Sequence, residues 1–126
     1  MDVPSAPLSG HSIGAASRRS GFSMDTLRYY DKIGLLGDIG RSASGRRVFS
    51  EADLSLLGML KCLRDTGMPV AEMLRFAELA RAGDHTVPQR LKLLEDHHAR
   101  VDADIADLRA KQAAVAGKID HYRTKR

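Results

Sequence analysis

The sequence predicts a mainly α-helical protein with a small winged helix-turn-helix head and one long C-terminal helix. Three observations predict this fold class. Two short amphipathic segments are joined by a three-residue turn with a central glycine, which is the helix-turn-helix pattern. A glycine-rich segment with three arginines follows them and predicts a wing. Apolar residues then recur at alternating steps of four and three from residue 87 onward, which indicates a coiled coil.

The two short segments carry capping residues at the expected places. Ser12 is placed to cap a helix over residues 13–19, and Ser23 is placed to cap a second helix over 24–33. Gly21 supplies the φ freedom that the tight turn between them needs. Because consecutive helical residues point about 100° apart, the adjacent tyrosines of "LRYYD" cannot share one buried face, so at least one of them faces solvent.

The wing covers residues 37–48, where helical periodicity is absent, and predicts a β-hairpin or a loop that projects basic side chains. Ser50 then caps a third helix, and Asp53 stands three residues later as in a capping box. Pro69 suits the first position of a fourth helix over residues 69–81. Together these elements predict a head over residues 12–81.

The last segment, residues 85–123, is the most regular and predicts a coiled-coil helix. In a monomer its seam would stay exposed, so a homodimer is the simplest arrangement, with a helix folded back on its own domain as the alternative. Heptads alone leave parallel and antiparallel pairing open, and the polar seam residues are placed to set the register. The predicted dimer seam consists of Val87, Leu91, Leu94, His98, Val101, Ile105, Leu108, Gln112, Val115, Ile119 and Tyr122.

Length and composition limit the class of the protein. A chain of 126 residues with 43% hydrophobic and 29% charged residues reads as one modest globular domain with an extension. No apolar run approaches the roughly 18 residues of a membrane span, so we expect no membrane partner. Residues 1–11 predict a disordered tail, and they lack the basic start and apolar core of a secretory signal, so we expect a cytoplasmic protein.

The positive charge of the chain is concentrated in the head. The net charge is +4, and residues 11–47 hold seven lysines and arginines against three aspartates, which accounts for the whole excess. A basic segment with interspersed aromatic residues is typical of a protein that binds a polyanion. A solvated basic surface without a partner is the alternative interpretation of charge alone.

Two quoted segments resemble the MerR family of bacterial transcription regulators. They are "SIGAASRRSGFSMDTLRYYDKIGLL" and "RSASGRRVFSEADLSLLGMLKCLRDTGMPVAEM", which together span about residues 12–80 in the family's order. The resemblance implies a winged helix-turn-helix head on an antiparallel coiled-coil homodimer. It also implies binding to double-stranded promoter DNA between elements set too far apart, with distortion of that DNA so that RNA polymerase engages both.

The resemblance assigns roles to residues of the head. It implies that Arg28 and Tyr29 reach the DNA backbone while Tyr30 packs inward, and arginine and tyrosine donors suit phosphate contacts. In the wing, Arg47 matches the family's arginine, whereas Arg46 and Phe49 stand where tyrosines are common. The start of the second helix would approach the major groove. The predicted DNA-binding residues are Arg18, Arg19, Ser23, Met24, Asp25, Thr26, Arg28, Tyr29, Arg46 and Arg47.

Cys62 is the only cysteine, which excludes an intramolecular disulfide and a multi-thiolate metal site within one chain. The segment around it resembles the small aldehyde- and electrophile-responsive branch of the family, which carries a single cysteine at this place. Cys62 is therefore a candidate sensor, with Lys61 and Arg64 nearby in sequence to favour its thiolate if their charges lie close. A buried cysteine acting as a small hydrophobic residue is the alternative.

The sequence favours a DNA-binding regulator over an enzyme. It has no glycine-rich phosphate loop, no paired acidic motif, and no nucleophile with an assigned base, so we expect no catalytic site and no cofactor. His98 and Asp102 lie one helical turn apart, but a seam histidine beside a solvated neighbour is the simpler interpretation, so no metal is expected. An architectural DNA-bending protein with a structural Cys62 and no effector is the alternative function.

Overall fold

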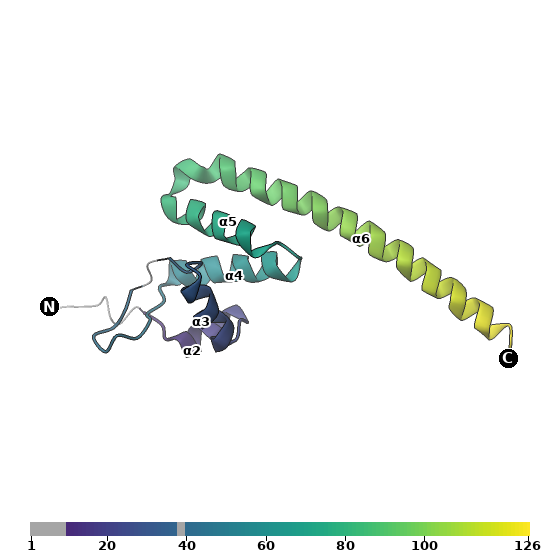
Figure 1. The fold of residues 1–126 in the computed structure, drawn as a ribbon, viewed down its shortest axis with the longest axis horizontal. Helices are drawn as coiled ribbons and strands as arrows, with labels where there is room; N and C mark the ends of the chain where they lie inside the picture. The colour runs from purple at the N-terminus through teal and green to yellow at the C-terminus, as the bar shows by residue number, and fades with distance from the viewer. Residues whose placement is uncertain (1–9, 38–39) are drawn as a thin grey trace. The chain divides into compact units, whose positions relative to one another are not determined.

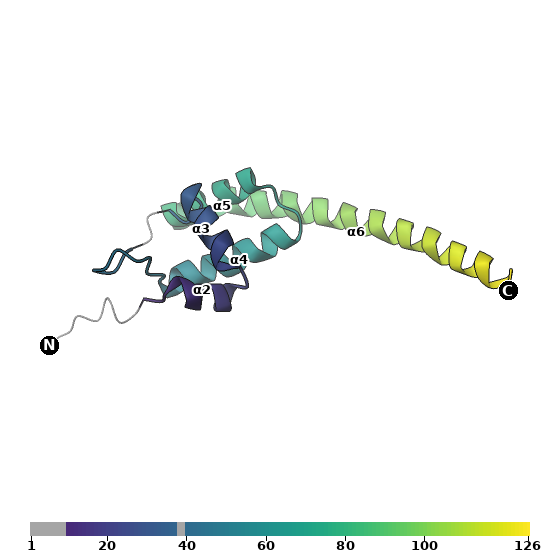
Figure 2. The same cartoon turned by 60° about the horizontal axis from the view of Figure 1, so that its bottom comes forward.

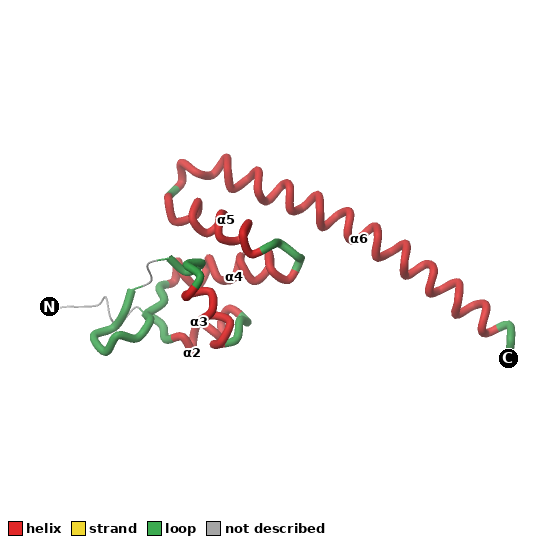
Figure 3. The backbone as a smooth tube through the Cα atoms, viewed as in Figure 1, coloured by secondary structure: helices red, strands yellow, loops and turns green. Residues whose placement is uncertain are grey.

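The computed structural model describes residues 10–37 and 40–126, and within them it is helical (Figure 1). The chain divides into two units, Met1–Arg90 and Leu91–Arg126. Figure 3 shows helices joined by loops and no strand in the part drawn in colour. The helices are α2 (Ile13–Ser20), α3 (Met24–Lys32), α4 (Glu51–Asp65), α5 (Val70–Ala82), the short 3₁₀ helix η1 (Asp84–Thr86) and α6 (Val87–Arg123).

The predicted helix-turn-helix is confirmed in α2 and α3. The Ser12 hydroxyl accepts a hydrogen bond from the backbone N–H of Ala15 at 3.1 Å, and Ser23 accepts one from Thr26 at 3.0 Å. Both serines have extended backbone conformations, as N-cap residues do. Gly21 ends α2 with φ of 86°, a left-handed conformation that a side chain would make costly.

The third helix, α4, begins with the predicted capping box. Ser50 accepts a hydrogen bond from the backbone N–H of Asp53, and the Asp53 carboxylate accepts one from the backbone N–H of Ser50. The next helix differs from the prediction by one residue. Pro69 has an extended ψ of 149° and is the N-cap, so α5 begins at Val70.

The core of the first unit lies along α4, which contacts α2 on one side and α5 on the other (Figure 2). Side chains from the turn, the loops and the helices fill it, because each amphipathic helix turns its apolar face inward. The largest fully buried side chains are Phe22, Phe49, Leu27, Leu35, Leu57, Leu60 and Met73.

The head includes His11, which the sequence placed in the tail. Residues 1–9 of the predicted tail lie outside the described residues. His11 and Phe49, however, exchange backbone hydrogen bonds of 2.8 and 2.7 Å in an antiparallel bridge. The prediction of a tail is therefore wrong at residue 11, because this residue pairs with the end of the wing.

The wing is a tight hairpin-like loop, of which residues 38–39 lie outside the described part. Arg41 and Arg47 form an antiparallel bridge, and the backbone N–H of Ser42 donates to the carbonyl of Arg46 at 2.8 Å. Gly45 takes φ of 85° at the turn. Pairing is limited to isolated bridges, so the wing holds its shape through a few hydrogen bonds.

The long C-terminal helix is confirmed. The α-helix α6 runs over 37 residues from Val87, two residues after the predicted start, because residues 84–86 form η1 instead. At 1.5 Å per residue it extends for about 56 Å. Among the described residues, none of the helices combines the length and the apolarity needed to cross a membrane.

Candidate nucleic-acid interface

The start of α3 presents a polar, accessible surface. Met24 and Asp25 are exposed and Thr26 is half-buried. The Ser23 hydroxyl donates to the hydroxyl of Thr26 at 2.9 Å, in addition to accepting from its backbone N–H. The N-terminal turn of α3 is thus rigidly capped while its outer side chains remain free to meet a ligand.

The two adjacent tyrosines divide in the way that the family resemblance implies. Tyr30 is 4% exposed and meets Phe22 edge to face with ring centroids 5.2 Å apart, whereas Tyr29 is 53% exposed. The guanidinium of Arg64 lies 4.8 Å from the Phe22 ring centroid, so a cation–π contact covers this cluster. Tyr30 therefore anchors α3 in the core, and the Tyr29 hydroxyl is held on the surface.

Three basic residues of the first two helices lie on the surface. Arg18 and Arg28 are exposed, and one Nη of Arg28 lies 3.1 Å from Asp25, an exposed ion pair one turn apart. Arg19 donates twice to Glu51, at 3.0 and 3.1 Å. This fork-shaped contact crosses from the end of α2 to the start of α4 and fixes the direction of the Arg19 guanidinium.

Glu51 is the centre of a three-residue cluster. Its carboxylate is 2.6 Å from the Nε2 atom of His11, in addition to its two bonds from Arg19. The hydrogen bond from Arg19, followed by the one from His11, lowers the pKa of Glu51. The same contact raises the pKa of Arg19. The cluster joins the chain before α2 to the start of α4.

The wing arginines differ in their surroundings. Arg46 is exposed, whereas the Arg47 side chain is 18% exposed and donates from Nε to Asp31 of α3 at 2.9 Å, with a second contact from its Nη2 atom. Arg41 donates to the carbonyl of Gly45 at 2.8 Å, and its guanidinium lies 4.0 Å from Asp31. Asp31 thereby ties the wing to α3.

Phe49 belongs to the core. Its side chain is fully buried, so it fills space beneath the wing and presents nothing to a ligand. A phenylalanine where the resemblance makes tyrosine common is consistent with this apolar, inward-facing position. The surface of the wing is made by its arginines.

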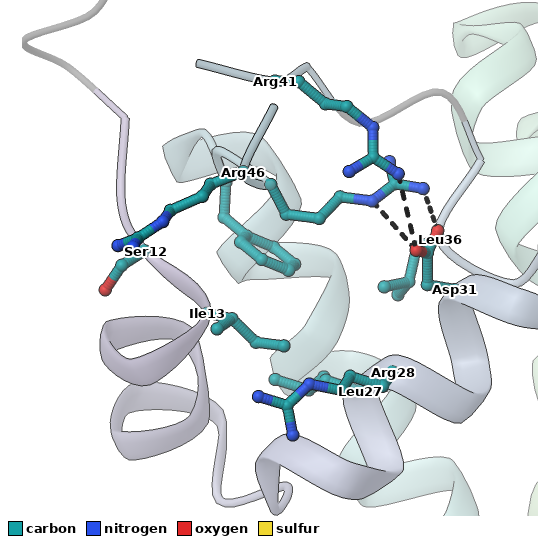
Figure 4. A pocket seen from close by; sticks show the side chains of 10 residues that line it. Ser12, Ile13, Leu27, Arg28, Asp31, Leu36, Arg41 and Arg46 are labelled. Carbon is teal, nitrogen blue, oxygen red and sulfur yellow. Dashed lines mark hydrogen bonds and ion pairs between the residues drawn. The ribbon is translucent and has the colours of Figure 1, made fainter. Parts of the chain in front are cut away.

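A groove of about 450 Å³ lies between α3 and the wing. Figure 4 shows Arg28 coming from α3 and Arg41 and Arg46 coming from the wing, with Asp31 joined by dashed lines to a guanidinium beside it. Arg47 is the fourth arginine of the lining, and Leu27, Leu36 and Phe49 contribute apolar surface. Four guanidinium groups around one groove form a strongly basic surface, which suits phosphate.

Sequence reasoning named three of these four arginines and missed the carboxylates that hold them. Arg41 was counted among the wing arginines, but nothing singled it out as a site residue. Asp31 and Glu51 are 16 and 32 residues away from Arg47 and Arg19, respectively, so no local pattern connects them. Asp31 is one of three aspartates within residues 11–47 and Glu51 lies just beyond them, so composition singles out neither residue.

Cys62 lies on α4 with an exposed side chain. The alternative interpretation, a buried cysteine, is therefore wrong for the described chain. The two cations nearby in sequence are engaged by one carboxylate, because Asp65 contacts Lys61 and also lies 3.1 Å from an Nη atom of Arg64. The hydrogen bond from Lys61, followed by that from Arg64, lowers the pKa of Asp65. Asp65 thus offsets the positive charge that was expected to act on the thiol.

The expected coiled-coil seam is exposed along much of α6. Among its apolar members, Leu91, Ile105, Leu108, Val115, Ile119 and Tyr122 are 44–68% exposed, and Leu94 and Val101 are half-buried. Within the described residues, no group of three or more metal-ligating side chains is gathered anywhere.

Two family models match this chain. The model described as "MerR HTH family regulatory protein" matches residues 11–78, and the model described as "MerR, DNA binding" matches residues 54–117. The first match starts at His11, the residue that pairs with Phe49, and it covers the groove with all four arginines.

Similar proteins carry related names. An uncharacterized HTH-type transcriptional regulator of Haemophilus influenzae is 40% identical over 107 residues, covering 85% of this chain and 79% of that protein. The HTH-type transcriptional regulator AdhR of Bacillus subtilis is 32% identical over 89 residues, covering 71% of this chain and 64% of AdhR.

Solved structures of MerR family regulators are also similar to this chain. The crystal structure of HiNmlR, a MerR family regulator lacking the sensor domain, bound to promoter DNA, superposes with a TM-score of 0.79 at 37% identity and covers 91% of each chain. A MerR family transcriptional regulator from Bacillus thuringiensis superposes with a TM-score of 0.78 at 34% identity, covering 87% of this chain and 96% of that one. The helical head, its basic groove and these matches lead to one conclusion: the chain belongs to the MerR family of helix-turn-helix regulators and is a sequence-specific DNA-binding transcriptional regulator rather than an enzyme.

Proposed function

We propose that the chain works as a homodimer in which the N-terminal turn of α3 enters the major groove and the wing lies against the DNA backbone. The observation that carries this proposal is the groove of about 450 Å³ lined by four arginines from α3 and the wing. Guanidinium groups donate in pairs to phosphate oxygens, and such contacts set the register of a protein on DNA. The exposed Tyr29 hydroxyl adds a donor on a rigid arm.

Two of the basic residues are held in place before DNA arrives. Arg19 is fixed by Glu51 and Arg47 by Asp31, so each meets the backbone with little loss of side-chain entropy. Arg28 and Arg46 are more exposed and are the ones that we expect to reorganise on binding. The carboxylates also limit the net charge of the surface, which restrains non-specific binding.

The proposal includes distortion of the promoter. By resemblance to the family, the dimer binds between promoter elements set too far apart and bends and untwists the DNA so that RNA polymerase engages both. Bending a site of 20 to 30 base pairs costs on the order of 1 to 6 kcal/mol. Phosphate contacts from both heads must offset this cost, which requires the two heads to be rigidly coupled through α6.

We further propose that Cys62 gates the response to an electrophile such as an aldehyde. Its exposed side chain is accessible to a small reagent, which favours a sensor over a packing role. The thiolate sulfur would add to the carbonyl carbon, and the carbonyl oxygen would take a proton from water, giving a thiohemiacetal without any oxidant. The bulkier, polar adduct would change how this face of α4 packs in the dimer.

Salt dependence tests the phosphate contacts. We expect the logarithm of the DNA association constant to fall linearly with the logarithm of salt concentration, by about 0.9 for each phosphate neutralised. Fluorescence anisotropy with a labelled promoter fragment measures this slope. An affinity that does not change with salt would rule out the phosphate contacts.

In vitro transcription tests the gating. We expect transcription from a promoter with a long spacer to rise with aldehyde, and this induction to be lost in Cys62→Ala, while both proteins occupy the DNA equally. Ser55→Ala, an exposed site on the same helix, is the matched control. If the mutant still responds, the signal acts elsewhere. If the protein bends DNA but transcription ignores both changes, the architectural alternative is the better account.

A further inference from the structure

We propose that two α6 helices pair antiparallel in one specific register, with Ile105 of one protomer opposite Leu108 of its partner. In this register Asp102 faces the partner's Arg109, and Asp104 faces the partner's Lys111. The inference rests on the homodimer proposed above and adds to it the register and the ion pairs that select it.

The central part of the seam has the shape of a contact surface. Ile105 and Leu108 are 44% and 68% exposed, and with Arg109 and Gln112 they line a shallow groove of about 360 Å³ along α6. Exposed apolar residues at heptad spacing on a helix of 37 residues require a partner helix of similar length. A second copy of α6 supplies both the length and the spacing.

Overlap of the two seams favours this register. In an antiparallel pair, each seam residue lies level with one seam residue of the partner. Residue numbers rise along one helix while they fall along the other, so one such pair fixes all the others. With Ile105 opposite the partner's Leu108, Leu91 lies opposite Tyr122, so every seam residue from Leu91 to Tyr122 has a counterpart. Val87 alone has no counterpart. The slide that puts Val115 opposite the partner's Ile105 also leaves Leu91 and Leu94 without a partner and buries less apolar surface. The opposite slide pairs Val87 with the partner's Ile119 and loses only Tyr122, so the overlap is unchanged there and charge has to decide.

Charge at the positions beside the seam favours the same register over the slide that overlap leaves open. These flanking residues meet across an antiparallel pair within their own row, at the e positions on one side and the g positions on the other. On one side Asp102 meets the partner's Arg109, and on the other Asp104 meets the partner's Lys111. The two-fold axis repeats both contacts, giving four attractive pairs around the centre.

Neighbouring registers place like charges together. Sliding by one heptad in one direction brings Arg109 against the partner's Arg109 and Lys111 against the partner's Lys111. Sliding in the other direction brings Asp102 against the partner's Asp102 and Asp104 against the partner's Asp104. Like charges at such positions are unfavourable. The second slide also sets Arg90 against the partner's Lys118, so charge disfavours it although it gains a Glu95–Arg109 pair. The first slide regains attraction through Glu95–Arg123 and Asp104–Lys118, and it is disfavoured by its smaller overlap.

The flanking charges are available in the single chain. Within the described residues, Asp102, Asp104 and Arg109 have no ion-pair partner, and Lys111 lies 2.7 Å from Asp107 on the outer side of its own helix. Lys111 can contact both aspartates because an ammonium group has three donors.

Cysteine crosslinking tests the register, using the full chain with Cys62→Ala as background. In the proposed register Val115 faces the partner's His98. A tagged Val115→Cys chain is mixed with His98→Cys, with Ile105→Cys or with Leu91→Cys chains, and treated with a short bis-maleimide. The proposed register predicts crosslinking mainly to His98→Cys. The Ile105→Cys and Leu91→Cys chains report the two one-heptad slides, and Val115→Cys alone reports parallel pairing.

Sedimentation of the same samples separates failure of the register from failure of the dimer. Monomers at every concentration would overturn the homodimer itself. Dimers that crosslink mainly through Ile105→Cys, through Leu91→Cys or through Val115→Cys alone would overturn the register and leave the homodimer standing. Dimers without any of these products would also overturn the register, because its nearest pair would then be too far apart to react.

Charge reversal gives a second readout that does not depend on cysteine reactivity. Asp102→Arg and Arg109→Asp each replace two attractive pairs with two repulsive ones, and we expect each to weaken dimerisation roughly tenfold. The double variant restores the pairs with their signs exchanged and should recover most of the affinity. Asp120→Arg, on the outer face of α6, is the control. Additive losses in the double variant would overturn the assigned pairs.

Discussion

Two carboxylates hold arginines of the basic surface of the head in fixed positions. Glu51 holds Arg19 and His11, and Asp31 holds Arg47, so two carboxylates position two arginines that come from different elements. Arg28 has a different environment, because its partner Asp25 is on the same helix and both are exposed. Exposed ion pairs contribute little to stability, so Arg28 can turn to phosphate at little cost.

Substituting Arg28 should therefore affect DNA binding and leave folding unchanged. We expect Arg28→Ala to weaken binding by about tenfold on operator and non-operator DNA alike, and to reduce the salt slope by about 0.9 for each head. Anisotropy titrations at several salt concentrations measure both quantities. Arg75→Ala, an exposed arginine of α5, is the control, and equal effects of the two variants would contradict a local role of Arg28.

Glu51 makes the stability of the head depend on pH. Its pKa in the folded state is lowered from its usual value of 4.5 by Arg19 and His11, so its stabilising contribution is complete above that value. The contribution is lost as pH falls through the folded pKa. We expect Glu51→Gln to unfold at a lower temperature than the natural chain at neutral pH, with the difference vanishing once pH falls below the lowered pKa of Glu51.

Calorimetry of both proteins across this range measures the effect. Glu95→Gln, an exposed residue of α6, is the control, and it should follow the natural chain throughout. A constant difference between Glu51→Gln and the natural chain at all pH values would show that the ion cluster does not stabilise the head through the charge of Glu51.

At the scale of elements, capping decides where helices begin. Each of α2, α3 and α4 starts after a serine whose hydroxyl accepts a backbone hydrogen bond, and α4 adds the reciprocal contact from Asp53. These contacts involve residues three apart, so they can be predicted from sequence. The start of α4 matters most for the site, because Ser50 follows the wing and Glu51 holds Arg19.

Removing the cap of α4 should destabilise the head measurably. We expect Ser50→Ala to lower the free energy of unfolding by about 1 kcal/mol, because the backbone N–H of Asp53 loses its partner. Urea denaturation followed by circular dichroism measures it. Ser55→Ala, in the exposed interior of the same helix, should be neutral or slightly stabilising. A neutral Ser50→Ala would show that water replaces the cap without loss.

At the scale of the whole molecule, α6 carries an apolar seam that one chain leaves largely exposed. We expect Leu108→Asp to abolish dimerisation, because it puts a charge at the centre of the seam, while the head stays folded. Sedimentation gives the oligomeric state, and DNA binding should weaken strongly because the two heads are uncoupled. Ala110→Asp, on the outer face of the same turn, is the matched control and should remain dimeric.

The sequence by itself determined the helix-turn-helix, the capped starts of the helices, the family motif and the heptad seam, because each depends on residues close together along the chain. Only the tertiary structure decided that Asp31 holds Arg47, that Glu51 joins Arg19 to His11, that residue 11 pairs with the wing, and that Cys62 is exposed. These features depend on contacts between distant residues or on which face of a helix is covered. Packing of the whole head settles both, and no local pattern encodes them.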